Sequence, residues 1–170
     1  TYGGYIDSAI EIKDAILSSP VKTVTYVNKK AMSAGSLIAV AGEKMYMAPG
    51  STIGAAQARE GEEKADYKVT SAWVSEMRST AEARGKDPKL MAAMAEESIV
   101  IDGLVDEGEL LSLTDNESLE LGLADGSASS LLDVCTAENL TDDTITTVEE
   151  SGLEKIVAFL TSPVVSGLLI

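Results

Sequence analysis

The chain has 170 residues, which is enough for one domain with a hydrophobic core but short for two full domains. Its 13 basic and 28 acidic residues give a formal net charge of -15, which repels phosphate backbones, so nucleic-acid binding is not expected. The lack of histidine and the single cysteine exclude an intrachain disulfide and the usual zinc, copper and haem ligand sets, and we expect no metal and no cofactor.

The first part of the chain predicts two helices with a strand between them. Apolar residues recur every three or four positions over residues 4–18, the period of an amphipathic helix, and residues 21–27 have the composition of a short buried strand. A loop, NKK, follows at 28–30. Residues 33–42, SAGSLIAVAG, predict a buried helix closed by Gly42 in the left-handed conformation.

A strand, a polar loop and a long helix are predicted next. Residues 44–48, KMYMA, read as a strand, whereas the run from 57 to 66 is polar and has no period, which is typical of a mobile surface loop. From 67 to 84 an apolar face returns with helical spacing, and Gly85 is the expected stop.

Two capped helices are predicted further along. Asp87 is a candidate N-cap for a helix over 87–98, and Thr114 with Glu117 fits a capping box. Strand-like segments lie between and after these helices, and the alternation favours an α/β layered domain. The segments are 99–101, 109–113 and 144–148.

Both ends of the chain indicate a piece of a longer protein. It begins at Thr1 without a methionine, and the stretch from 156 to 170, IVAFLTSPVVSGLLI, carries no charge. A membrane-spanning helix needs about 20 such residues. The stretch is therefore either a buried C-terminal helix broken near Pro163 or the approach to a membrane span.

Ser33 is the first candidate for chemistry, because it lies between small residues at the start of an apolar helix. The residues leave two interpretations open: a helix N-cap whose hydroxyl bonds the next turn, or a nucleophile. Without histidine, the base of a serine nucleophile is a carboxylate or an uncharged lysine. A lysine amine has an unperturbed pKa of about 10.4, so a lysine base needs an apolar, buried setting to work near neutral pH.

Lys68 fits that setting best, because it opens the helix whose inner face carries Ala72 and Trp73. For any single lysine the alternative is an exposed, solubilising charge. The other lysines considered lie in charged segments, loops or turns: Lys29, Lys30, Lys64, Lys86 and Lys89. The Gly3–Gly4 pair before the first helix is either a tight turn or a source of backbone N–H donors for a developing oxyanion.

Four segments resemble long-form NfeD proteins, a family of membrane-bound serine proteases related to signal peptide peptidase A and, more distantly, to ClpP and the crotonases. They are YGGYIDSAIEIKDAILSSPVKTVTYV, MSAGSLIAVAGEKMYMAPGSTIGAA, KVTSAWVSEMRSTAEARG and LTDNESLELGLADG, and together they cover most of residues 2–130. No single motif is decisive, but four in register are fairly specific.

The resemblance implies a role for each matching residue. Ser33 is the nucleophile, Lys68 is its base, and the backbone N–H groups of Gly4 and Ala34 form the oxyanion hole. It also implies a substrate groove, lined by Gly3, Met32, Ile53 and Gly54. On this basis we expect a serine endopeptidase with a Ser-Lys dyad that cleaves hydrophobic segments of membrane-associated proteins such as stomatin homologues.

The resemblance also implies an architecture and a location. We expect an α/β, ClpP/crotonase-like fold of stacked ββα units over residues 1–136, apparently lacking its N-terminal strands. A linker or strand segment at 137–152 and an apolar helix at 153–170, the start of a truncated membrane-proximal region, complete the expected organisation. The protease domain is expected as a homodimer or larger homo-oligomer on the extracytoplasmic side of the cell membrane.

The sequence departs from the family pattern at three places, and two of them, Tyr2 and Met32, motivate an alternative function. Tyr2 stands where a proline is usual, Met32 replaces a small residue, and the loop between the first strand and Ser33 is short. One alternative is a non-catalytic interaction module that binds a membrane partner. Another is an acyl-CoA enzyme of the crotonase type, in which the serine and the lysine have no assigned role.

Overall fold

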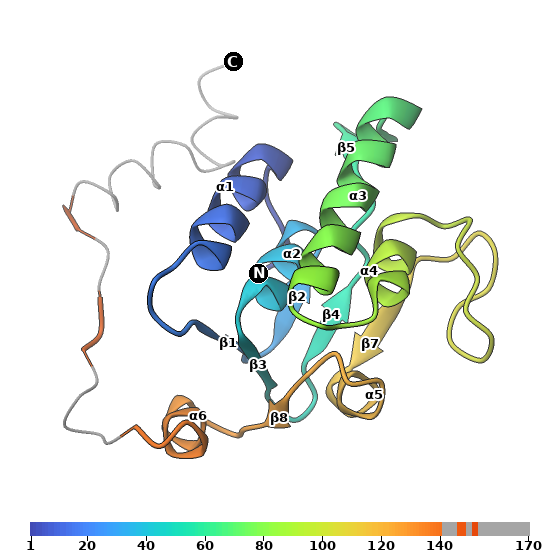
Figure 1. Cartoon of the computed structure of the whole chain (residues 1–170). Helices are drawn as coiled ribbons and strands as arrows, with labels where there is room; N and C mark the ends of the chain where they lie inside the picture. Colours follow the sequence, from blue (N-terminus) through green and yellow to red (C-terminus); the bar gives the residue numbers. More distant parts are fainter. Residues whose placement is uncertain (141–145, 149–150, 153–170) are drawn as a thin grey trace. The chain divides into compact units, whose positions relative to one another are not determined.

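A computed structural model describes residues 1–140, 146–148, 151 and 152, and the chain divides into two units, Thr1–Glu138 and Asn139–Ile170. In the first unit helices alternate with short strands (Figure 1). The helices are α1 (Ile6–Leu17), α2 (Ala34–Ala41), α3 (Tyr67–Ala83), α4 (Pro88–Ala95), α5 (Asp115–Glu120) and α6 (Leu131–Ala137). The strands are β1 (Val24–Val27), β2 (Lys30–Met32), β3 (Lys44–Met47), β4 (Thr52–Gly54), β5 (Arg59–Glu60), β6 (Glu63–Lys64), β7 (Ser112–Thr114) and β8 (Gly126–Ser127).

The strands form two three-stranded sheets and one hairpin. The first sheet has the order β1-β3-β8 and is parallel throughout, with Val24 opposite Lys44. The second has the order β2-β4-β7, with β2 parallel and β7 antiparallel to β4. Parallel neighbours need a crossover, and α2 lies in the connection between β1 and β3. The expected α/β architecture is confirmed.

The core surrounds α2, as its apolar sequence predicts. Every residue of α2 except Ile38 is buried, and the helix contacts α1, α3 and β1. Methionine contributes much of the remaining core, because its flexible thioether fills irregular gaps between elements. The fully buried methionines come from β3, α3 and α4: Met45, Met47, Met77, Met91 and Met94.

Charged side chains tie α1, α2 and α3 together. Lys13 of α1 is buried, and its Nζ donates to Glu76 of α3 at 2.8 Å. Near the C-terminal end of α3, Arg84 donates from Nε to the carbonyl oxygen of Ala41 at 2.6 Å and from its guanidinium to that of Ile16 at 3.5 Å. Arg84 therefore fixes the C-terminal ends of both α1 and α2 against α3.

The predicted helices are present, and the expected end signals at Asp87, Thr114 and Gly85 are confirmed. Asp87 accepts a hydrogen bond from the N–H of Lys89 at 2.8 Å, and Thr114 and Glu117 form the reciprocal capping box. Gly85 ends its helix with a φ of 66°. These signals depend on residues close together in the chain, which is why sequence alone finds them.

Several expectations need correction. Lys30 belongs to β2, so the NKK segment is not entirely a loop. The polar run 57–66 contains the hairpin β5–β6, which is anchored because Ala58 and Ala65 are buried and joined by a 3.0 Å backbone hydrogen bond. Gly42 is extended, with a φ of -64°, and not left-handed. Its lack of a side chain matters because a Cβ would lie 2.9 Å from Cγ2 of Thr25.

The remaining strand predictions are only partly met. Segment 99–101 contributes a single bridge from Ile101 to Val105, and segment 109–113 enters β7 at its end. Of segment 144–148 the structure describes 146–148, which are not in a strand. The apolar segment 153–170 lies outside the described residues. Helix α6 and strand β8 were not predicted.

Asp125 joins β8 to β3 and should make stability depend on pH. It accepts hydrogen bonds from the N–H of Met45 at 2.9 Å and from the Lys44 and Lys86 ammonium groups at 3.0 Å each. Burial by itself raises the pKa of Asp125, but these hydrogen bonds and charges outweigh burial and lower the pKa below its usual value. A carboxyl with a lowered folded-state pKa contributes stability above its unfolded pKa and loses it as the pH falls through the folded-state value.

We therefore expect Asp125→Asn to lower the free energy of unfolding at about pH 7, and the difference from wild type to shrink as the pH falls below about 4. Urea unfolding at several pH values measures both. Asp102→Asn, at an exposed position, serves as the control. A difference that stays constant down to about pH 2 would contradict this role of the Asp125 charge.

Candidate active site

Ser33 lies between β2 and α2 in a backbone conformation that is rare for a residue with a side chain. Its φ is 54° and its ψ is -131°. Such a conformation costs on the order of 1–3 kcal/mol and persists where the surrounding structure imposes it. Although Ser33 holds the N-cap position of α2, its hydroxyl makes no capping hydrogen bond, so the capping interpretation of this side chain is wrong.

The end of β4 holds the Ser33 backbone in place. The N–H of Ser33 donates to the carbonyl oxygen of Gly54 at 3.0 Å, continuing the pairing of Met32 with Gly54. Gly54 has a φ of 135°, and a Cβ there would lie 2.4 Å from the carbonyl oxygen of Leu111. Glycine at this position therefore lets the β4 backbone approach Leu111 and Ser112, at the start of β7.

The Gly3–Gly4 turn packs directly against Ser33. Gly3 has a φ of 113°, and a Cβ on it would lie 2.7 Å from Cβ and 3.0 Å from Oγ of Ser33. A side chain at residue 3 would therefore displace either the turn or the serine. The structure thus brings together two segments that sequence analysis singled out separately.

Two backbone donors beside Ser33 are free of internal partners. Within residues 1–140, the N–H groups of Gly4 and Ala34 donate no hydrogen bond to another residue. Both lie at helix starts, Gly4 before α1 and Ala34 as the first residue of α2, where the helix dipole is positive. Such groups suit a negatively charged oxygen.

Two cavities border this turn. The Ser33 cavity has a volume of about 220 Å³ and is lined by Gly4, Tyr5, Ile6, Ser33, Gln57, Ala58, Arg59 and Trp73. The apolar cavity, of about 240 Å³, is lined from α1 and α2 and includes Gly3, Gly4, Ala34, Ile12 and Ile38. Gly4 is common to both, so an extended chain crossing the turn would have a cavity on each side.

Lys68 is placed differently from the sequence expectation. It is the second residue of α3 and its side chain is exposed, because the buried face of α3 runs through Thr70, Trp73 and Met77. In the part of the chain that the structure describes, neither the Lys68 ammonium nor the Ser33 hydroxyl donates a hydrogen bond to the other. The expected burial of Lys68 is therefore not found.

The expected groove residues differ in accessibility. Met32 is half-buried, and its sulfur lies 3.8 Å from Oγ1 of Thr52. Ile53 is 0% exposed and belongs to the core, so its side chain lines no open surface, and that expectation is corrected. Successive side chains of a strand point to opposite faces of the sheet, and the sequence pattern around residue 53 did not show which face the Ile53 side chain takes.

Gln57, Ala58 and Arg59 form a wall of the Ser33 cavity that the sequence did not predict. The indole N–H of Trp73 donates to the carbonyl oxygen of Ala56 at 2.6 Å and thereby fixes this wall against α3. The sequence signal that could have indicated this wall is the position of the polar segment, which directly precedes the helix that carries Lys68.

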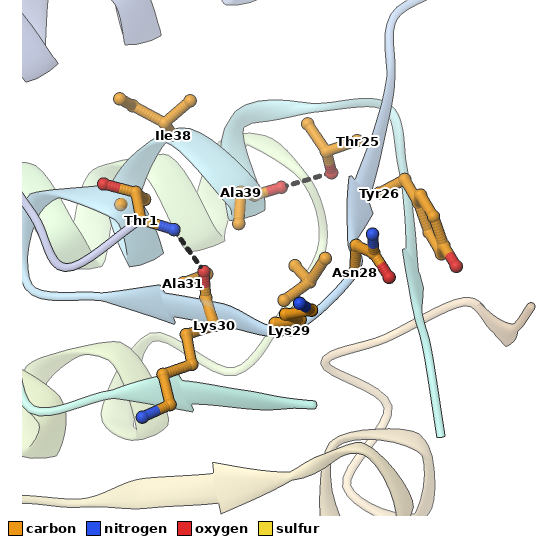
Figure 2. A pocket seen from close by; sticks show the side chains of 11 residues that line it. Thr1, Thr25, Tyr26, Asn28, Lys29, Lys30, Ala31, Ile38 and Ala39 are labelled. Atoms are coloured by element: carbon orange, nitrogen blue, oxygen red, sulfur yellow. Dashed lines mark hydrogen bonds between the residues drawn. The ribbon is translucent and has the colours of Figure 1, made fainter. Parts of the chain in front are cut away.

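A larger cavity of about 550 Å³ lies elsewhere, between the edges of β1 and β2 (Figure 2). The Thr1 ammonium donates to the carbonyl oxygen of Lys30 at 2.7 Å there, and Thr25 Oγ1 donates to that of Ala39 at 2.6 Å. Neither Ser33 nor Lys68 lines it. Ser33 lines the smaller Ser33 cavity, whereas Lys68 lines neither of the two, so Ser33 is the residue that points to the smaller cavity.

Comparison with known proteins shows the family to which the chain belongs. The family model of the NfeD1b N-terminal domain matches residues 1–148. The chain belongs to this family. It is 36% identical over 172 residues to membrane protein NfeD1b of Bacillus subtilis (strain 168), and 27% identical over 195 residues to membrane-bound protease PH1510 of Pyrococcus horikoshii. The alignments cover all of this chain but 39% and 42% of those proteins, so the chain spans about two-fifths of their length.

Solved structures show the same fold for this NfeD1b-family domain. A lysine-to-alanine mutant of the 1510-N membrane-bound stomatin-specific protease of Pyrococcus horikoshii, in complex with a substrate peptide, matches with a TM-score of 0.73 and 21% identity over 94% of this chain and 78% of that one. ClpP1 of Listeria monocytogenes matches with a TM-score of 0.55 and 17% identity over 76% and 69%. The expected ClpP-like α/β fold is confirmed.

The curated relatives are membrane proteins by name. Within the described residues, no helix combines the length and the apolar character that crossing a bilayer requires.

The close contact at Gly3 predicts a difference between neighbouring glycines. We expect Gly3→Ala to lower the free energy of unfolding by roughly 1–3 kcal/mol. The alanine would have to take the left-handed backbone of Gly3, and its Cβ would overlap Ser33. Gly4→Ala is the matched control, since a Cβ there has no atom within 4 Å. Urea unfolding measures both, and equal effects of the two substitutions would contradict the packing described.

Proposed function

We propose that this domain is the catalytic part of a serine endopeptidase in which Ser33 is the nucleophile and Lys68 is the base. The observation that carries the proposal is the left-handed backbone of Ser33, with its hydroxyl unused as a cap and packed against the Gly3–Gly4 turn. Backbone strain of this kind clusters at functional sites. Relationship to a membrane-bound protease supports the same reaction class.

In the proposed reaction Oγ of Ser33 attacks the carbonyl carbon of a peptide bond while the neutral amine of Lys68 accepts the hydroxyl proton. The negative charge that develops on the carbonyl oxygen is stabilised by the N–H groups of Gly4 and Ala34. The lysine ammonium then gives its proton to the leaving amine. A water molecule, activated by the same lysine, hydrolyses the acyl-serine and restores the hydroxyl.

The proposed reaction requires the Lys68 side chain to turn from solvent toward Ser33. Its place near the start of α3, beyond the β5–β6 hairpin, is compatible with such a turn, because a lysine side chain has four rotatable bonds. A substrate covering the Ser33 cavity would also exclude water, and withdrawal from water favours the neutral form of an amine. The substrate itself thus completes the dyad in this proposal.

We propose apolar segments of stomatin-like membrane proteins as the substrates. The apolar cavity beside Gly4 suits such segments, and the 1510-N protease is named for stomatin specificity. Gly3, Met32 and the backbone of Gly54 border the path of the substrate chain in this proposal. The full protein acts as a homodimer or larger homo-oligomer, with this domain, over residues 1–136, on the extracytoplasmic side of the cell membrane. Residues 137–152 link it to an apolar membrane-proximal segment at 153–170.

A non-catalytic module that binds a membrane partner is the second candidate function. The exposure of Lys68, and the absence of a hydrogen bond between it and Ser33 within the described residues, favour it. A serine-directed phosphonate distinguishes the two candidates, because it labels a serine only where a base and an oxyanion hole activate the hydroxyl. Labelling of Ser33 that Lys68→Ala abolishes supports the peptidase, and absence of labelling in the full-length protein supports the binding module.

Substitution of the proposed dyad should abolish turnover. We expect Ser33→Ala and Lys68→Ala each to lower kcat for an apolar stomatin-derived peptide by about 1,000-fold or more, and the double variant to lose no more than either one. Initial rates of cleavage by the full-length protein measure this.

Ser71→Ala and Lys89→Ala replace an exposed serine and an exposed lysine and should retain the wild-type rate. Cleavage at the wild-type rate by a folded Ser33→Ala variant would refute the peptidase assignment.

A further inference from the structure

One polar contact beside the Ser33 cavity has no part in the proposed reaction. Gln57 lines the cavity, and its Nε2 donates to Oε2 of Glu97 at 2.9 Å. Glu97 lies two residues beyond α4 and does not line the cavity. A carboxylate outside the cavity therefore holds an amide in its wall.

The same carboxylate also holds the β5–β6 hairpin. Its Oε1 accepts from Nζ of Lys64 at 3.1 Å, and Lys64 also pairs with Glu96 at 3.1 Å. The hydrogen bond and charge of Lys64 lower the pKa of Glu97, so Glu97 stays ionised at neutral pH. Glu97 thus connects the cavity wall to the strand that ends four residues before Lys68.

An ionised carboxylate has no proton to donate and can only accept hydrogen bonds. The NH₂ end of the Gln57 amide must therefore face Glu97, and the carbonyl end is turned away from it. Among the residues that the structure describes, Oε1 of Gln57 accepts no hydrogen bond. A half-buried acceptor without a partner is suited to bind an N–H donor that enters the cavity.

We propose that Glu97 is a positioning residue of the Ser33 site, which orients the Gln57 amide so that its carbonyl oxygen accepts a hydrogen bond from a backbone N–H of the substrate. This inference rests on the proposed peptidase function and extends it. Gln57 is then a substrate-binding residue, and Glu97 acts through it. Glu96, which pairs with Lys64 but not with Gln57, has no such role.

A double-mutant cycle on the full-length protein tests the proposal. We expect Gln57→Ala and Glu97→Gln each to raise KM for the apolar peptide by about 3- to 10-fold with little change in kcat. Gln57→Ala removes the hydrogen bond to the substrate. In Glu97→Gln the Lys64 ammonium occupies the one remaining carbonyl oxygen, so an NH₂ group faces Gln57 and turns the Gln57 carbonyl oxygen away from the substrate. The double variant should show no larger effect than either single one, because both substitutions remove the same interaction. Glu96→Gln is the matched control, since it weakens the Lys64 pair in the same way, and its KM should stay within about twofold of wild type.

KM values for peptides that carry one N-methyl group, each at a different backbone position, distinguish a substrate contact from a merely structural role of Gln57. At one position, methylation should raise KM for the wild type by about 3- to 10-fold and leave KM for Gln57→Ala unchanged. Glu97→Gln is isosteric, so loss of folding is not expected, and circular dichroism checks it.

The outcomes separate the two proposals. Cleavage that persists after Ser33→Ala, or a full-length protein that cleaves no peptide, refutes the peptidase function and with it the substrate role of Gln57. Cleavage that depends on Ser33, combined with additive effects of Gln57→Ala and Glu97→Gln or with an equal effect of Glu96→Gln, refutes the role of Glu97 and leaves the peptidase function standing.

Discussion

The contact between the Gly3 backbone and the Ser33 side chain is the constraint on which the rest of the candidate site depends. The two segments approach so closely that a Cβ on Gly3 would overlap Ser33, and Ser33 itself takes a strained, left-handed backbone. The strain is sustained because α2 behind it is buried, and each fully buried large aliphatic side chain such as Leu37 contributes about 1.5–3 kcal/mol. Packing of the core therefore outweighs the cost of presenting the hydroxyl.

The arrangement of three helices gives the site its electrostatic character. In the chain, α1 begins just after the Gly3–Gly4 turn, α2 begins just after Ser33, and α3 begins at the residue before Lys68. Arg84 ties the C-terminal ends of α1 and α2 to α3. The positive ends of α1 and α2 favour negative charge near Gly4 and Ala34. These positive ends therefore suit the oxyanion-stabilising role proposed for the N–H groups of Gly4 and Ala34.

The sequence predicted the elements that depend on local patterns. The helical periods of α1 to α4, the Asp87 cap and the Thr114 capping box involve residues within a few positions of each other, and each was found. The resemblance to NfeD proteins named Ser33 and the Gly3–Gly4 turn, and the structure brings the two together. Strand β8 pairs with the distant β3, and each strand of the β5–β6 hairpin has two residues, so neither has a period that the sequence could show.

The direction of side chains was harder to predict than the elements themselves. Lys68 and Trp73 share one helix, but a separation of five residues turns them about 140° apart around the helix axis, so the apolar face that buries Trp73 leaves Lys68 in solvent. The orientation of Ile53 depends on the pairing of β4 with β2 and β7, which involves residues far apart in the chain. The reason for glycine at residue 42 is the nearby Thr25 side chain and not the backbone angle, and a sequence does not display that contact.

The cavity between β1 and β2 has a consequence for how the domain behaves in concentrated solution. Within the described residues each of these strands has a partner strand on one side, and Thr1 covers part of the β2 edge by bonding to Lys30 and Met32. The outer edge of β1, VTYV, is uncharged and rich in β-branched residues, and such an edge is a template for intermolecular sheet formation. In concentrated solution this edge is therefore where a further strand, from a longer form of the chain or from another molecule, would pair, and a lysine introduced on β1 would oppose that pairing.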